Sequence, residues 1–228
     1  MANKIIGILG CGWLGFDLAL QLKKQAYQVR GTSRTDEKLL QLSEKGIHAF
    51  KIDLQEDKIY GDVQGFLEGL DVLVIDIPPG LRQNPESDFA FRIQLFMRFV
   101  QAYEINKVLF ISSTSVFEDM EEFFFEEETF TYDEYALPNA TSNNGKKIIA
   151  AEQVVQEMAH QSTIIRPCGL IGGDRHPVKM LAGRKGIKNP EAPINLVTRD
   201  HVNAIILKVI AGTLDAPVIH AVSEPHVS

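Results

Sequence analysis

The sequence predicts an α/β fold in which helices cover both faces of a parallel β-sheet. Unbroken apolar runs of strand length alternate with amphipathic stretches of helix length along most of the 228 residues, which is the pattern of repeated β-α-β units. The first apolar run, 5–9, leads directly into a glycine-rich turn with the sequence Gly10-Cys11-Gly12-Trp13-Leu14-Gly15. A turn of this spacing between a buried strand and an amphipathic helix predicts a Rossmann-type, doubly wound parallel sheet.

The first half of the chain is expected to contain four strands and three helices. The run 5–9 is short and apolar, and the helix at 13–24 has leucines at roughly helical spacing, at positions 14, 18, 20 and 22. The same alternation predicts strands at 27–33, 47–52 and 71–77, with helices at 35–45 and 63–70 between them. Pro78 and Pro79 end the fourth strand, because proline has no backbone N–H with which to continue a sheet.

The second half continues this alternation after one interruption. The helix expected at 89–103 has apolar side chains along one side, namely Phe89, Ile93, Phe96 and Val100. Residues 117–135 mix acidic and aromatic side chains without a clear period, so we expect a long loop that acts as a lid or contact surface. The remaining elements are strands at 108–112, 163–167 and 217–222 and helices at 145–160 and 199–210.

Composition excludes several classes of function. A net charge of −7 gives no basic face for nucleic acid. Cys11 and Cys168 lie far apart without metal-ligand spacing, which predicts no disulfide framework and no metal site. No apolar stretch approaches eighteen residues and no signal peptide precedes the first strand, so we expect a cytoplasmic protein that does not bind membranes.

The glycine turn predicts dinucleotide binding. Glycines let a pyrophosphate approach backbone N–H groups at the positive end of the following helix. The alternative is a glycine-rich turn in an α/β protein that binds no ligand. Cys11 and Trp13 are expected to pack rather than to act in redox chemistry or stacking.

The end of the second strand favours NADP(H) over NAD(H). NAD-specific folds usually place a carboxylate there for the ribose hydroxyls, whereas this chain has Gly31-Thr32-Ser33-Arg34. The hydroxyl of Ser33 and the forked guanidinium of Arg34 suit the 2′-phosphate of NADP. The alternative is that Arg34 is simply solvated at the start of a helix.

Several motifs in order resemble the extended short-chain dehydrogenase/reductases, in particular the NAD-dependent epimerase/dehydratase branch that acts on nucleotide sugars. They are the glycine turn, Ile52-Asp53-Leu54, Pro78-Pro79, the segment 112–117, and Arg166-Pro167 with Gly169 and Gly172. The resemblance runs from about 4 to about 222. It implies that Asp53 binds the adenine amino group, Arg34 the adenosine phosphate, Pro78 the ribose region and Pro167 the nicotinamide amide. The alternative interpretation, from the residues alone, is that Asp53 caps a turn and that the prolines only end strands.

The resemblance also implies a catalytic Ser, Tyr and Lys, and here the chain is atypical. Ser113 matches the Ser. Glu152 matches a glutamate eight residues after the Tyr, which puts Asn144 at the Tyr position and Ile148 at the Lys position. An amide cannot shuttle a proton and isoleucine supplies no cation, so the usual proton transfer is not supported. Other candidate groups are Lys146 and Lys147, which lie out of helical register, and Tyr132 and Tyr135, which are more simply read as packing aromatics.

We expect one domain, residues 1–228, in which about 169–216 contributes a small C-terminal lobe. Relatives of the resembling family continue beyond the strand at 217–222, so the lobe is reduced or the sequence is a fragment. A cationic cluster in this lobe, Arg175 with His176 and Lys179, either meets an anionic ligand or is a set of solvated charges.

Two hypotheses of function remain. The first is an NADP-dependent enzyme of the epimerase/dehydratase or reductase kind, monomeric or homodimeric, which acts on a small molecule such as a nucleotide sugar with Ser113 orienting it. The second is a non-catalytic dinucleotide-binding protein that regulates or senses redox state, and it is motivated by Asn144 and Ile148.

Overall fold

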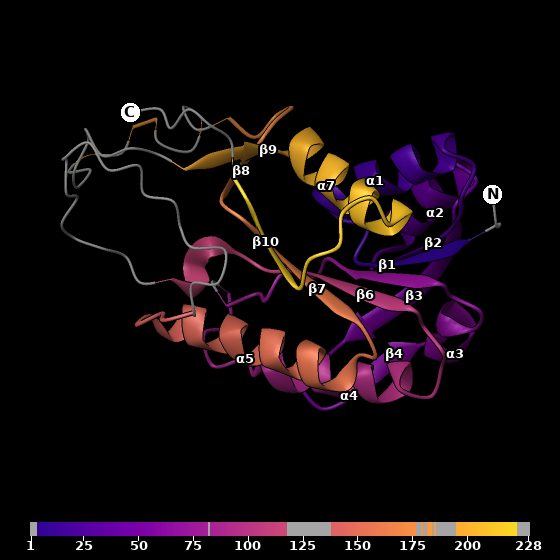
Figure 1. The fold of residues 1–228 in the computed structure, drawn as a ribbon, viewed down its shortest axis with the longest axis horizontal. Coiled ribbons are helices and arrows are strands. Elements are labelled where there is room, and N and C mark those ends of the chain that lie inside the picture. Colours follow the sequence, from indigo (N-terminus) through magenta and orange to yellow (C-terminus); the bar gives the residue numbers. More distant parts are fainter. Residues whose placement is uncertain are drawn as a thin grey trace.

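The computed structural model describes residues 4–81, 83–117, 138–176, 179, 182–183, 185 and 195–222. Their centre is an eight-stranded sheet with strand order β10-β7-β6-β5-β1-β2-β3-β4 (Figure 1). The strands are β1 (Ile5–Leu9), β2 (Gln28–Ser33), β3 (His48–Leu54), β4 (Ile59–Gly61), β5 (Val72–Ile75), β6 (Lys107–Ile111), β7 (Ser162–Pro167) and β10 (Val218–Ala221). All neighbours pair in parallel except β3 and β4, which are antiparallel.

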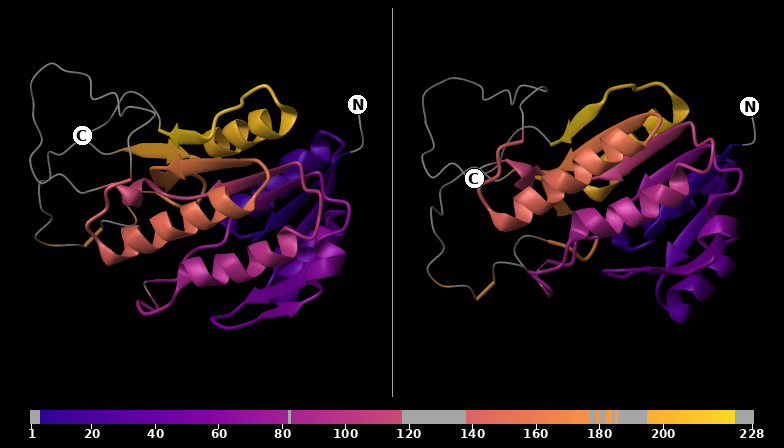
Figure 2. Two further views of the ribbon diagram at one scale, coloured as in Figure 1. Left: turned by 60° about the horizontal axis from the view of Figure 1, so that its bottom comes forward. Right: turned by 90° about the horizontal axis from the view of Figure 1, so that it is seen from below.

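Helices cover both faces of the sheet, as the alternation of apolar runs predicts (Figure 2). One face carries α1 (Trp13–Lys24), α2 (Asp36–Glu44) and α7 (Arg199–Ala211), and the other carries α3 (Val63–Leu67), α4 (Phe89–Val100) and α5 (Asn143–Met158). Each face has its own apolar core. Leu18 and Ile206 are fully buried in the first core, and Phe66 and Phe96 are fully buried in the second.

A second, two-stranded parallel sheet follows β7. It consists of β8 (Gly169–Ile171) and β9 (Leu196–Thr198). Helix α7 continues from β9 and packs beside α1, so that Val202 and Ile206 share a core with Leu18. The described part of 169–216 is therefore joined to the glycine-turn helix, and its role as a substrate lobe stays a prediction.

The predicted doubly wound α/β fold is confirmed, and every predicted strand and helix outside the loop region is present with shifts of a few residues at its ends. The three short strands β4, β8 and β9 were not predicted. The loop predicted at 117–135, including Tyr132 and Tyr135, lies outside the described residues apart from Phe117. Within the described ranges, no helix is both long and apolar enough to cross a membrane.

Candidate functional site

The glycine turn lies at the point where the winding of the sheet reverses. β1 has β2 on one side and β5 on the other, so the chain proceeds outward from β1 in one direction and outward from β5 in the other. Ligands of open α/β sheets bind outside the carboxyl ends of the strands at such a switch point. Gly10 follows β1 there, and Asp76 follows β5 beside it.

Each glycine of the turn has a distinct structural reason. Gly10 has φ of 103°, and a Cβ there would lie 2.3 Å from the carbonyl oxygen of Asp76. A Cβ at Gly15 would lie 2.4 Å from the carbonyl oxygen of Gly10, so its absence lets α1 pack closely on the turn. A Cβ at Gly12 would meet nothing within 4 Å, so Gly12 faces open space. The turn therefore leaves room for a ligand at its middle glycine.

The start of α1 leaves backbone donors without partners. The side chains of Ser142 and Thr198 cap α5 and α7, whereas Gly12 offers no side-chain cap to α1. Among the described residues, the amides of Trp13 and Leu14 have no hydrogen-bond acceptor. Orphan amides at the positive end of a helix are suited to a phosphate group.

Thr32 fixes the turn to the neighbouring strand β2. Its Oγ1 accepts a hydrogen bond from the Gly10 amide at 2.8 Å, and its carbonyl accepts one from the Cys11 amide at 2.9 Å. The Cys11 side chain is buried, and burial raises the pKa of its thiol to about 12. Cys11 therefore packs as an uncharged thiol, and its amide is used by Thr32.

Asp76 contacts the turn from β5. Its Oδ2 accepts a hydrogen bond from the Gly15 amide at 2.9 Å. Burial raises the pKa of this carboxyl to about 7, although the Gly15 hydrogen bond and the charge of Arg175 act in the opposite direction. A carboxyl next to the turn can thus be neutral near physiological pH, which reduces repulsion of an anionic ligand.

A cavity of about 320 Å³ lies at the β2 and β3 side of the turn. It is lined by Arg34, Lys51, Asp53, Gln55, Tyr60 and Gly61. Lys51 is paired with Asp36 at 2.7 Å, and Gln55 donates to Asp53 at 3.0 Å. The structure therefore brings Arg34 and Asp53 to one cavity, and the unpredicted strand β4 supplies its Tyr60 wall.

Arg92 of α4 reaches toward the same region. Its Nη2 donates to the carbonyl of Pro79 at 2.8 Å, while its buried Nε has no partner among the described residues. Burial lowers the pKa of Arg92, and the positive charge of Arg34 acts in the same direction. The negative charges of Glu56 and Asp53 partly oppose this shift. Arg92 thus lies within electrostatic range of Arg34 and Asp53.

The positions expected for catalysis do not assemble the usual set of groups. Ser113, after β6, caps a short 3-10 helix, η1 (Thr114–Val116), because its Oγ accepts a hydrogen bond from the Ser115 amide at 3.2 Å. Asn144 is exposed in the first turn of α5, and Ile148 is buried with an exposed fraction of 7%. The side chain at the expected Lys position is therefore an uncharged isoleucine.

The two lysines just before Ile148 do not take the place of the expected catalytic lysine. Lys146 is exposed. The Nζ of Lys147 donates to the carbonyls of Pro85 and Ser87, the latter at 2.9 Å, and so ties α5 to the segment before α4. Tyr132 and Tyr135 lie outside the described residues.

A buried ion pair joins Glu152 of α5 to Arg166 of β7. Glu152 and Arg166 have exposed fractions of 2% and 3%, and Arg166 binds Glu152 through two hydrogen bonds of 3.0 and 2.7 Å. Ser112 Oγ also donates to Glu152. Burial and the charge of Arg166 lower the pKa of the nearby His220. Glu152 thus joins α5 to β6 and β7 and is enclosed rather than open to a ligand.

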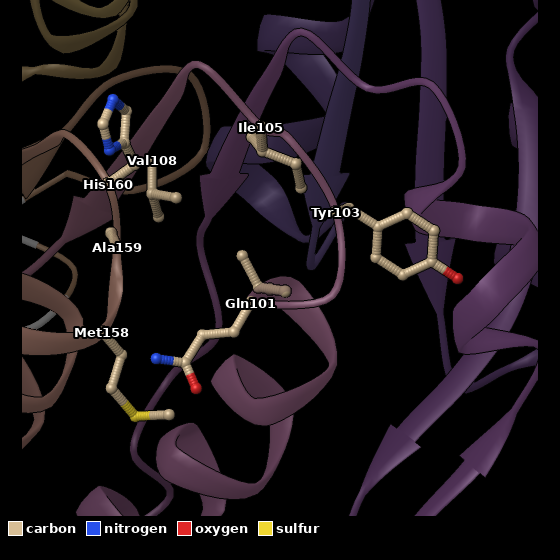
Figure 3. Close-up of a pocket in the computed structure, with 8 residues that line it drawn as sticks. Gln101, Tyr103, Ile105, Val108, Met158, Ala159 and His160 are labelled. Atoms are coloured by element: carbon tan, nitrogen blue, oxygen red, sulfur yellow. The ribbon is translucent and has the colours of Figure 1, made fainter.

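The remaining predicted positions lie at strand ends. Pro78 is exposed after β5, and Pro167 is buried at the carboxyl end of β7. A further cavity, of about 270 Å³, lies between the C-terminal ends of α4 and α5 (Figure 3). Its walls include Met158, His160 and Val108, which lies at the amino end of β6. The glycine turn instead follows the carboxyl end of β1.

Comparison with known protein families agrees with the geometry of the turn. The model of a family described as NAD(P)H-binding matches residues 10–213. The chain belongs to the NAD(P)H-binding family. Protein YeeZ from Escherichia coli K12 is 30% identical over 208 residues, which are 90% of this chain and 72% of that protein.

Solved structures confirm the predicted resemblance of this NAD(P)H-binding protein to epimerases. A mutant UDP-glucuronic acid 4-epimerase from Bacillus cereus, in complex with NAD and a fluorinated UDP-sugar, superposes with a TM-score of 0.74 at 15% identity, covering 98% of this chain and 79% of that chain. A UDP-N-acetylglucosamine 4-epimerase from the same organism gives 0.69 at 12%, covering 99% and 80%. A conserved protein of unknown function from Silicibacter pomeroyi gives 0.68 at 18%, covering 98% and 73%. These likenesses show the fold.

The described residues fit a dinucleotide. Gly12 leaves space, the start of α1 offers two free amides, and a cavity lies beside the end of β2. Sequence reasoning missed Asp76 and Lys51 in this region. The signal for Asp76 was a carboxylate directly after a buried strand at the switch point, whereas Lys51 gave no signal in the sequence.

Proposed function

We propose that this chain binds NADP(H) in preference to NAD(H), and that it holds the dinucleotide without the Tyr/Lys pair of typical short-chain dehydrogenase/reductases. The observation that carries the proposal is the cavity beside β2, which Arg34 and Lys51 help to line, together with the absence of a carboxylate among residues 31–34 at the end of that strand. Dinucleotide binding itself rests on the family to which the chain belongs.

The charges around this cavity suit a phosphate. The guanidinium of Arg34 provides forked, charge-assisted donors, whereas the ammonium of Lys51 is already paired with Asp36 at 2.7 Å. Arg34 is exposed, so it can turn toward a ligand, and Ser33 ends the strand beside it with a hydroxyl. Asp53 lines the same cavity, where its carboxylate would accept a hydrogen bond from the adenine amino group. These residues support recognition of the 2′-phosphate together with the base.

The roles of the other predicted residues follow from their positions. The amides of Trp13 and Leu14 would bind the pyrophosphate, with Gly10, Gly12 and Gly15 giving it room. Pro78 and Pro167 would border the ribose and nicotinamide at the ends of β5 and β7. Bound NADP(H) would supply hydride transfer chemistry. The protein would orient it, and no described residue at position 144 or 148 would move a proton.

The test of this proposal isolates the phosphate contact. Calorimetric titration with 2′,5′-ADP and with 5′-AMP compares two ligands that differ in the 2′-phosphate. Wild type should bind 2′,5′-ADP at least about tenfold more tightly, and Arg34→Gln should lose most of that difference. Lys45→Gln is the matched control, because Lys45 is an exposed cation at the end of α2 outside the cavity. Equal affinities of wild type for the two ligands would refute the proposal.

A second candidate is an enzyme of the epimerase/dehydratase or reductase kind with a different proton donor. Ser113 favours it, because its partly buried hydroxyl lies at the carboxyl end of β6 on the ligand side of the sheet. The bound UDP-sugar of the Bacillus cereus epimerase makes a nucleotide sugar the first substrate to test. Dinucleotide-dependent turnover that is lost in Ser113→Ala would establish this candidate. Without turnover, a difference in affinity between NADP and NADPH would instead support redox sensing.

A further inference from the structure

The indole of Trp13 is contacted by two guanidinium groups beside the glycine turn. The Cζ atoms of Arg175 and Arg199 lie 4.3 and 4.8 Å from the ring centroid. Asp174 Oδ1 accepts a hydrogen bond from the indole Nε1 at 3.2 Å. Residues 161 positions apart in the chain thus fix the first side chain of α1.

A tight turn after β8 presents Arg175. Gly172 and Arg175 exchange two backbone hydrogen bonds of 2.9 and 3.0 Å, and the intervening backbone uses φ values of 131° at Gly172 and 55° at Gly173. A side chain at Gly172 would contact both Arg199 and Trp13 at 3.7 to 3.8 Å. The two glycines therefore allow this turn to close against Trp13.

Arg199 is anchored and Arg175 is not. At the start of α7, Arg199 is paired with Asp17 of α1 at 3.4 Å and lies 3.8 Å from Asp200. The guanidinium of Arg175 has no ion pair or hydrogen bond with a described residue, and only the indole holds it. Stacking on an aromatic ring leaves the edge donors of a guanidinium free. Arg175 therefore keeps its donors available for a ligand.

The positive charge of Arg175 reaches the glycine turn. It stabilises the ionised form of Asp76, and Asp76 accepts the hydrogen bond from the Gly15 amide. The ring on which Arg175 stacks belongs to Trp13, whose own amide is without a partner among the described residues. Arg175 thus stacks on the side chain of the residue that begins α1, and the backbone amide of that same residue has no partner among the described residues.

We propose that Arg175 is the side-chain ligand of a phosphate oxyanion that binds at the start of α1, with Trp13 as its platform. Arg199, held by Asp17, adds a second fixed positive charge. The inference rests on the proposed function for the identity of the larger ligand, because the phosphate belongs either to the dinucleotide or to a second, phosphorylated molecule. It adds to that function a contact from the segment after β8.

The chain contains one tryptophan, so Trp13 reports on this site alone. Inorganic pyrophosphate is titrated into the full chain, with Trp13 emission as the site reporter and calorimetry as the measure of affinity. Wild type should bind, and Arg175→Gln should bind roughly tenfold more weakly or worse. Arg175→Lys, which keeps the charge without the fork, should lie between them. Arg98→Gln is the control, because Arg98 is an exposed arginine of α4 on the other face of the sheet.

Titration with NADPH distinguishes the two possible sources of the phosphate, the dinucleotide and a second phosphorylated molecule. If the dinucleotide supplies it, Arg175→Gln weakens NADPH by a similar factor, and NADPH-loaded wild type no longer binds pyrophosphate. If a second molecule supplies it, NADPH affinity is unchanged and the loaded protein still binds pyrophosphate through Arg175. Equal pyrophosphate affinity in wild type and Arg175→Gln, or no binding by wild type, overturns the proposal. If wild type does not bind NADPH at all, the proposed function is overturned. The comparison of pyrophosphate affinity between wild type and Arg175→Gln still tests the role of Arg175 in that case.

Discussion

The amide of Gly15 donates a 2.9 Å hydrogen bond to Oδ2 of Asp76 across the switch point of the sheet. This contact joins the third glycine of the turn to the end of β5, and it places a carboxyl group where an anionic ligand is expected. Burial raises the pKa of this carboxyl from 3.8 to about 7. The protonation of Asp76 should therefore influence both folding and ligand binding.

The first prediction concerns pH. Because the folded protein holds the Asp76 proton more tightly than the unfolded chain, stability from this group is full below about pH 3.8 and is lost as pH rises through 7. Between pH 5 and pH 8.5, the free energy of unfolding of wild type should fall by roughly 2 kcal/mol relative to Asp76→Asn. NADPH affinity should fall over the same range in wild type only. Urea unfolding and calorimetry measure both, and parallel pH profiles for the two proteins would contradict this role of Asp76.

The second prediction separates two glycines of the turn. Gly15→Ala should lower the free energy of unfolding by about 2 kcal/mol, because its Cβ would lie 2.4 Å from the Gly10 carbonyl oxygen. Gly12→Ala should change stability by less than about 0.5 kcal/mol, since its Cβ meets no neighbour within 4 Å, yet it should weaken NADPH binding at least about tenfold. Wild-type affinity in Gly12→Ala would show that the open space at Gly12 is not the ligand space.

The third prediction concerns the buried ion pair. Arg166→Met leaves the Glu152 carboxylate buried without a partner, so it should lower the free energy of unfolding by about 3 to 5 kcal/mol. The double variant Glu152→Leu with Arg166→Met should recover most of this loss. Asp36→Asn, which breaks an exposed pair with Lys51, is the control and should cost less than about 1 kcal/mol. Additive losses in the double variant would argue against direct coupling of the two charges.

The fourth prediction concerns the expected Lys position. Ile148→Lys places an ammonium group at a site with an exposed fraction of 7%, so it should lower the free energy of unfolding by about 3 kcal/mol. Ile149→Lys, one position on and only partly buried, should be milder. Thermal unfolding compares the two variants. A full-stability Ile148→Lys protein would mean that position 148 is open to the site after all.

The order of elements could be predicted because each long strand and helix has its own apolar period. Strand β4 could not be predicted, since three residues are too few to show a period. It forms because it pairs with β3, for example between Tyr60 and Asp53. The same reason applies to β8 and β9, which form a two-stranded sheet among the described residues and whose paired residues lie 27 positions apart in the chain. Short strands of this kind are determined by tertiary contacts rather than by local sequence.

The candidate site divides in the same way. The glycine turn is a local motif, and the assignment of Asn144 and Ile148 to the Tyr and Lys positions was inferred from spacing along one helix, in which Ile148 is buried. The contacts of Asp76 with Gly15 and of Asp174 with Trp13 join positions 61 and 161 residues apart. Such contacts depend on strand order, and no single stretch of sequence contains them.

The most direct test of the central claim is a titration of the wild-type chain with NADPH and with NADH under the same buffer and salt. The guanidinium of Arg34 and the absence of a carboxylate at the end of β2 predict saturable binding of both, with NADPH at least about tenfold tighter. Equal or tighter binding of NADH, or no saturable binding of either dinucleotide, would contradict it.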